Sequence, residues 1–162
     1  MAVLTANKEV PVKAAHGAQR TRKLPLVGYT TLTTTHEVYK GSIVICDQSI
    51  SDGYFRACPA SGSINSTTSD IFGGISMERV SVTASDAGDG SKSVTVLING
   101  AVGFPIGSLT VTDIGAPIYA VDDQLVGSSS SNTYWVGTLV NVDSTYAWVD
   151  ITHAVGRPNS AI

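Results

Sequence analysis

The sequence predicts an all-β protein, a small β-sandwich or β-barrel domain with an extended N-terminal arm. Valine, isoleucine and threonine supply 48 of the 162 residues, and β-branched side chains favour strands over helices. Sixteen glycines and 36 serines and threonines supply turns and solvent-facing strand positions. Turn signals recur roughly every 8 to 12 residues, as in sandwiches and barrels. The length fits one domain.

The first 23 residues differ from the rest of the chain in charge and in pattern. They show no sustained period of 2 or 3.6, and "KAAHGAQRTRK" is small and polar. Residues 1–40 carry a net charge of +4, whereas residues 41–162 carry −7. We therefore predict a basic arm over residues 1–23 and a β domain over residues 24–162 that folds without the arm.

Strand-like sequence begins at residue 24. The threonines between residues 30 and 35 suit an exposed extended segment, and "GSIVICD" at 41–47 is typical of a buried strand. Asp52-Gly53 predicts a tight turn. Alternation after Gly74 predicts a strand whose inward side chains are Ile75, Met77, Val80 and Val82.

The second half continues the same pattern. "SVTVLING" predicts a strand that ends at an Asn99-Gly100 turn, and residues 101–127 predict two or three strands separated by glycines. "SSSSN" at 128–132 is a loop. Residues 133–155 predict two strands around a turn at Asp143-Ser144.

Two adjacent aspartates, Asp122 and Asp123, interrupt an apolar run and raise the question of acid–base or metal chemistry. Neighbouring side chains of a strand point to opposite faces, so the pair cannot share one proton unless the chain turns there. Strand sequence lies on both sides, and aspartate caps backbone amides in turns. We predict a surface turn whose carboxylates are chemically dispensable.

No other motif supports an enzyme. His16, His36 and His153 lack zinc-site spacing, "DAGDGSKS" fails the calcium-loop pattern, and there is no G-x-S-x-G elbow. We predict no catalytic residue, cofactor or metal. An acidic body without interleaved aromatic and basic residues argues against nucleic acid, and no apolar run is long enough to cross a membrane.

The two cysteines, Cys46 and Cys58, lack a C-x-x-C motif and a nearby histidine. We expect buried thiols in a protein made in a reducing cytoplasm, with a single disulfide as the alternative.

A resemblance covers residues 94–151. The segments "GAPIYAVDDQ", "YWVGTLV" and "AWVDI" resemble the small capsid-decoration (cement) proteins of tailed bacteriophages, which show a glycine–proline strand, a tyrosine–aspartate segment and two final strands. The resemblance implies a structural virion protein on the capsid exterior that binds the major capsid protein and reinforces its contacts. Exposed strand edges and aromatic termini favour self-association. By analogy with the threefold positions of capsids we expect a homotrimer, with a dimer as the alternative.

The arm residues expected to bind the capsid are Val10, Val12, Lys13, Arg20, Arg22 and Lys23. Tyr119, Trp135 and Trp148 have apolar neighbours and are expected in the core or the oligomer interface. The alternative function is a carbohydrate-binding or host-adhesion β domain, with a stacking face made of Tyr119, Tyr134, Trp135, Tyr146 and Trp148.

Overall fold

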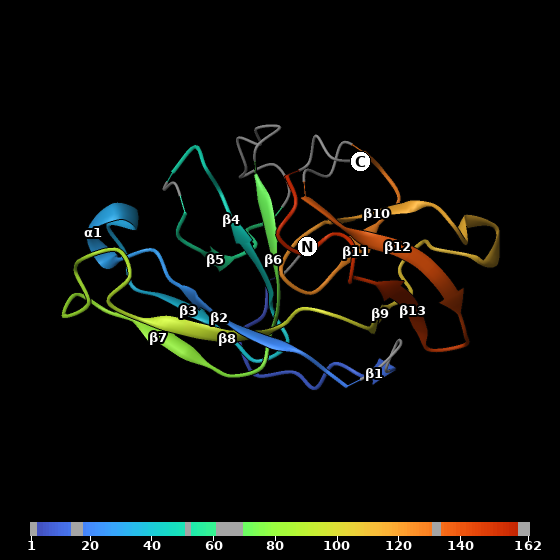
Figure 1. The fold of residues 1–162 in the computed structure, drawn as a ribbon, viewed down its shortest axis with the longest axis horizontal. Coiled ribbons are helices and arrows are strands. Elements are labelled where there is room, and N and C mark those ends of the chain that lie inside the picture. The colour runs from blue at the N-terminus through green and yellow to red at the C-terminus, as the bar shows by residue number, and fades with distance from the viewer. Residues whose placement is uncertain (1–2, 14–17, 51–52, 61–69, 131–133, 159–162) are drawn as a thin grey trace.

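A computed structural model describes residues 3–13, 18–50, 53–60, 70–130 and 134–158. The fold is all-β and forms a sandwich of antiparallel sheets rather than a closed barrel, so the predicted class is confirmed and the barrel alternative is not. Figure 1 shows an elongated molecule with sheet A to the right and the other strands to the left.

Sheet A has the strand order β1-β9-β13-β12-β10-β11. Its strands are β1 (Val12–Lys13), β9 (Ala101–Pro105), β10 (Pro117–Ala120), β11 (Val126–Gly127), β12 (Tyr134–Val142) and β13 (Tyr146–Asp150). The short 3-10 helix η1 (Val111–Asp113) lies between β9 and β10. The predicted turn at Asp143 is confirmed, because it joins β12 to its antiparallel partner β13.

Sheet B has the order β2-β8-β6-β4-β5, and a separate pair joins β3 to β7. These strands are β2 (Thr21–Pro25), β3 (His36–Val38), β4 (Ile43–Cys46), β5 (Arg56–Ala57), β6 (Ile71–Ser76), β7 (Val80–Val82) and β8 (Ser93–Leu97). The chain passes from β8 in sheet B to β9 in sheet A through Asn99-Gly100. The predicted turn there is a corner between sheets, and Gly100 has a φ of 102°.

Sheet B buries apolar side chains on both of its faces. One face shares the larger apolar cluster with sheet A, and the other shares a second cluster with β3 and β7. In β4, Ile43 and Ile45 belong to the first cluster and Val44 to the second. This explains the unbroken apolar run "IVIC", and the predicted buried strand is confirmed.

Two local predictions are wrong, and the boundary expected between residues 23 and 24 falls inside β2. The threonine segment begins with one helical turn, α1 (Tyr29–Leu32), because Gly28 N–H and Thr31 Oγ1 both donate to Asp89 Oδ1 at 2.7 Å. Met77 is 37% exposed, since β6 ends at Ser76 and the chain then leaves for another sheet. The Asp52-Gly53 turn and the 128–132 loop lie partly outside the described residues.

Candidate interaction site

The described start of the chain, residues 3–13, is called the leader here. It crosses the chain's own body and is held there by backbone hydrogen bonds. Leu4 N–H donates to Asp123 Oδ1 at 2.8 Å, and Lys8 N–H donates to the Lys40 carbonyl at 2.8 Å. Farther along, β1 adds to the edge of sheet A by pairing with β9. The leader is therefore a strap across the sandwich rather than a projecting arm.

Three of the six residues expected to bind the capsid belong to the leader and contact the rest of the protein. Val10 and Val12 are half-buried against the larger apolar cluster. Lys13 is exposed, and its Nζ lies 4.0 Å from the ring centroid of Trp148, which is a cation–π contact. Val10 and Val12 would have to detach before they could bind a partner, whereas Lys13 is exposed and in contact with Trp148.

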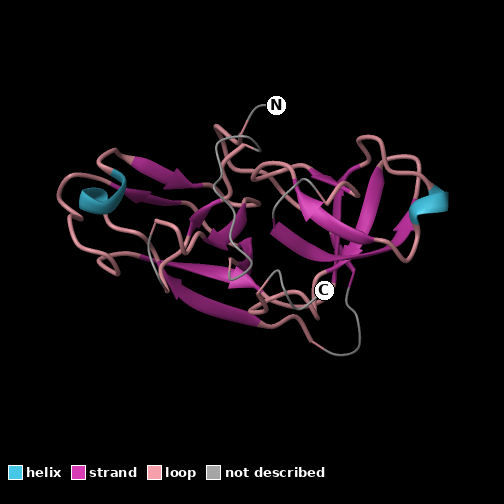
Figure 2. Ribbon diagram, turned by 90° about the horizontal axis from the view of Figure 1, so that it is seen from above, coloured by secondary structure: helices cyan, strands magenta, loops and turns pink. Residues whose placement is uncertain are grey.

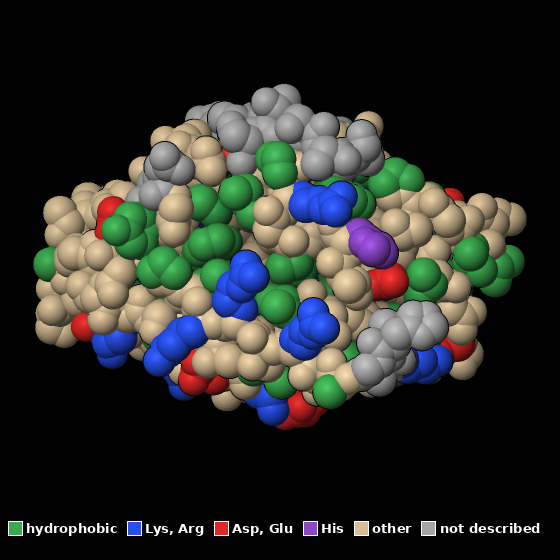
Figure 3. Space-filling view, viewed as in Figure 1, with side chains coloured by type: hydrophobic (Ala, Val, Ile, Leu, Met, Phe, Trp, Pro, Cys, Tyr) green, Lys and Arg blue, Asp and Glu red, His purple; other side chains and the backbone are tan. Residues whose placement is uncertain are grey.

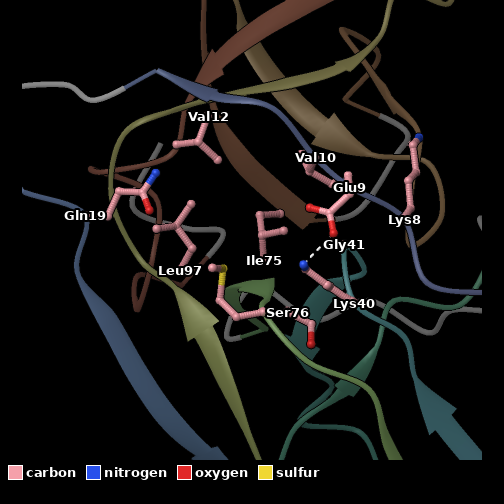
Figure 4. Close-up of a pocket in the computed structure, with 11 residues that line it drawn as sticks. Lys8, Glu9, Val10, Val12, Gln19, Lys40, Gly41, Ile75, Ser76 and Leu97 are labelled. Atoms are coloured by element: carbon pink, nitrogen blue, oxygen red, sulfur yellow. Dashed lines mark hydrogen bonds and ion pairs between the residues drawn. The ribbon is translucent and has the colours of Figure 1, made fainter.

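A cavity of about 210 Å³ lies between the leader and sheet B. Figure 4 shows Val10 and Val12 on one side, Ile75 and Leu97 opposite them, and the ion pair that joins Glu9 to Lys40. Ile75 and Leu97 are buried core residues. The leader thus covers the end of the apolar core between the two sheets.

The other three predicted residues are free of such contacts. Arg20, Arg22 and Lys23 are all exposed, and none forms an ion pair within the described part of the chain. They lie on or beside β2, the edge strand of sheet B. Figure 3 shows lysine and arginine side chains along the lower half of the molecule, where Figure 1 draws β2 and β8. Val10, Val12 and Lys13 thus contact the rest of the protein. The side chains of Arg20, Arg22 and Lys23 are exposed and form a basic edge.

The turn at the paired aspartates is confirmed, but its exposure is not. Asp122 Oδ1 accepts hydrogen bonds from the N–H groups of Gln124 and Leu125, both at 2.8 Å, as a turn-capping aspartate does. Both carboxylates are nevertheless buried. Asp123 accepts from Leu4 and, at 3.1 Å, from Ser42 Oγ, while burial raises its pKa. The predicted surface position of this turn is wrong, because the leader and the Ser42 segment cover it.

A second cavity, of about 510 Å³, has titratable groups in its wall, among them His36, Arg56 and Cys58. Burial raises the pKa of the Cys58 thiol, so it stays protonated at neutral pH, and burial lowers the pKa of His36. Arg56 donates to Asp47 at 3.2 Å. A protonated thiol and a neutral imidazole beside a paired arginine do not form an activated nucleophile.

The aromatic residues predicted to lie in the core or an interface are buried in the fold. Tyr119, Trp135 and Trp148 are at most 9% exposed, and Trp135 Nε1 donates to the Gly137 carbonyl of its own strand at 2.9 Å. Tyr134 is fully buried, and Tyr146 is half-buried. These five residues therefore do not offer an exposed stacking face for a sugar.

Sequence reasoning missed an exposed apolar surface at η1. Val111, Ile114 and Val140 are 64%, 48% and 44% exposed, and they lie together because Gly115 N–H donates to the Leu139 carbonyl. Figure 3 shows hydrophobic side chains at the right-hand end, where Figure 2 places this helix. The available signal was the Thr110-x-x-Asp113 capping box, which marks a helical start in sequence that otherwise resembles a strand.

Within the described ranges, no group of three histidine, cysteine or acidic side chains is arranged to hold a metal ion. None of the described helices is long and apolar enough to span a bilayer. No family model matches the chain, and comparisons with curated proteins and with solved structures find no significant match.

Proposed function

We propose that this protein is a structural virion protein that binds the exterior of a tailed-phage capsid and reinforces contacts between major capsid proteins. It is made in the host cytoplasm and acts without catalysis. The observation that supports this proposal most is the basic edge formed by Arg20, Arg22 and Lys23 on an otherwise acidic chain. The resemblance in residues 94–151 supports the same role, and that segment supplies five of the six strands of sheet A.

The capsid partner of this edge needs an acidic surface. Each exposed charge pair contributes about 0.2–1 kcal/mol, so three cations together contribute about 0.6–3 kcal/mol, or roughly 3-fold to 150-fold in affinity, when the salt concentration is low. Many copies on one particle then add such contacts over the whole shell. The role is mechanical, because each docked copy joins neighbouring capsid subunits that internal pressure tends to separate.

Self-association belongs to the same proposal, with a homotrimer favoured and a dimer as the alternative. The apolar surface of Val111, Ile114 and Val140 suits contact between identical copies. Near a symmetry axis each residue meets its own equivalent, and uncharged residues do so without repulsion. The sequence has no lysine or arginine between Lys92 and Arg157. The acid beside this surface, Asp113, accepts hydrogen bonds from the N–H and Oγ1 of Thr110 in the capping box.

Co-sedimentation with undecorated heads tests the proposal. We expect the triple variant Arg20→Gln, Arg22→Gln, Lys23→Gln to bind about 10-fold or more weakly than the wild type at low salt. The deficit should shrink as salt rises past the ~8 Å screening length of physiological buffer. The matched control, Arg79→Gln, Lys92→Gln, Arg157→Gln, has the same net charge and should bind nearly as the wild type does. Equal pelleting of all three proteins at every salt concentration would contradict the proposal.

A further inference from the structure

The outer edge of β2 has backbone groups to which no described residue hydrogen-bonds. The hydrogen bonds from Ile98 N–H to the Arg20 carbonyl, at 3.0 Å, and from Leu26 N–H to the Lys92 carbonyl, at 2.9 Å, fix which groups face β8. Hydrogen-bonded pairs alternate along an antiparallel ladder, so even-numbered residues of β2 face β8. The N–H and C=O groups of Thr21 and Lys23 therefore point outward. Among the described residues, none hydrogen-bonds to them.

This free edge ends at Pro25. Pro25 has the same outward parity, but it has no N–H, and its carbonyl accepts the Phe55 N–H at 2.9 Å. Phe55 in turn accepts the Val27 N–H at 2.9 Å, so the far end of β2 is already paired. Thr21–Lys23 is consequently a short exposed stretch with two donors and two acceptors.

The charges beside this stretch select its occupant. Leu24 is buried in the second apolar cluster, and Arg20 and Arg22 share its face of the strand, while Lys23 lies on the opposite face. An added strand would thus have cations on both faces. The same edge of a second copy would bring like charges together, which disfavours self-pairing. An extended acidic segment meets both requirements, because its backbone pairs with Thr21 and Lys23 while its carboxylates meet the cations.

We propose that the capsid protein docks by adding an extended acidic segment to β2 at Thr21–Lys23. This inference rests on the proposed function and specifies how the basic edge is used. Backbone pairing supplies a contribution that does not depend on charge, and the cations choose an acidic partner and speed the encounter.

Amide hydrogen exchange on the wild-type protein, with and without undecorated heads, tests this mode of binding. We expect the Thr21 and Lys23 amides to exchange at least 10-fold more slowly in the bound state. The Arg22 and Leu24 amides, which already face β8, should change little. Binding without protection of Thr21 and Lys23 would overturn strand addition and leave the proposed function intact. Failure to bind heads at all would overturn the proposed function, and the strand addition that rests on it.

A charge-neutral substitution provides a second test. Thr21→Pro removes an outward N–H without removing one that faces β8, and it leaves all three cations in place. Pro25 already lies at an outward-facing position of the same strand. We expect it to weaken head binding about fivefold or more at every salt concentration, whereas the matched control Thr21→Val retains wild-type binding. Wild-type binding by a folded Thr21→Pro protein would contradict the inference. If this variant does not fold, the exchange measurement on the wild type decides.

Discussion

Asp143 connects the β12–β13 turn to the aromatic pair behind it. Its Oδ1 accepts the N–H groups of Thr145 and Tyr146 at 2.8 Å, and its Oδ2 accepts Trp148 Nε1 at 2.7 Å. Trp148 packs edge-on against Tyr146, with ring centroids 5.7 Å apart. The indole donor is the main reason that the pKa of Asp143 falls from 3.8 to about 2, and the two backbone donors add to it.

The lowered pKa predicts a pH-dependent contribution to stability. Because the folded state favours the ionised carboxylate, the contribution is complete above the unfolded pKa of 3.8 and is lost as the pH falls to about 2. We expect Asp143→Asn to lower the Tm at pH 7 and to differ much less from the wild type at pH 2. Thermal melts at the two pH values measure this, with Ser144→Ala as the non-titrating control in the same turn. A Tm difference that is equal at both pH values would contradict the prediction.

The aspartates at 122 and 123 show how far local sequence can be used. Their place between two apolar stretches predicted the turn, because capping by aspartate is a local property. The burial of Asp123 involves Leu4 and Ser42, which are 119 and 81 residues away from it in the sequence. Contacts at such separations leave no periodic signal in the sequence, so the exposure of the carboxylates could not be predicted.

β2 is a whole strand that the sequence pattern alone could not predict. An edge strand that is exposed on both faces at Thr21, Arg22 and Lys23 has no apolar alternation, so its first half resembles an arm. β4 was predictable because apolar layers cover both of its faces. The basic composition that marked the candidate site was visible in the sequence. Its position on a free sheet edge required the pairing of β2 with β8.

Two N-terminal truncations separate the contribution of the leader to stability from that of β2. Deleting residues 1–13 removes β1 and the half-buried Val10 and Val12, which should lower the free energy of unfolding by about 2–4 kcal/mol and leave a folded body. Deleting residues 1–25 also removes β2, the partner of β8, and the buried Leu24. We expect this longer truncation not to fold cooperatively.

Urea unfolding followed by tryptophan fluorescence measures both truncations against the full chain. A deletion of residues 1–25 that unfolds as the full chain does would show that β2 is dispensable. It would confirm the prediction that the body folds without its first 23 residues.

The two ends of the elongated molecule differ in structure. Figure 2 shows α1 at one end and η1 at the other. The η1 end carries the three most exposed of the six large hydrophobic side chains that are exposed in the described residues. A stable interface buries about 800 Å² per partner, so these three side chains would form the centre of a larger contact.

This surface predicts the oligomeric state. Val111→Asp places a charge in the proposed contact without disturbing the core, because Val111 is 64% exposed. We expect light scattering to give a trimer mass for the wild type and a monomer mass for the variant. The control Ala84→Asp adds the same charge in the exposed loop after β7 and should keep the wild-type mass. A monomeric wild type at high concentration, or a variant of unchanged mass, would contradict self-association at this surface.

Strand pairing also limits how early the protein can fold during its synthesis. The two pairs concerned are β1 with β9 and β2 with β8. Thr21 pairs with Leu97 and Val12 with Val102, so each early strand is synthesised long before its partner. Ribosomes add about 5–20 residues per second, which makes the wait roughly 4 to 18 seconds. Neither sheet can take its final edge strand during that interval, and pairing over such separations slows folding further. β1 and β2, which flank the basic start of each chain, therefore stay without their sheet partners until β9 and β8 have been synthesised.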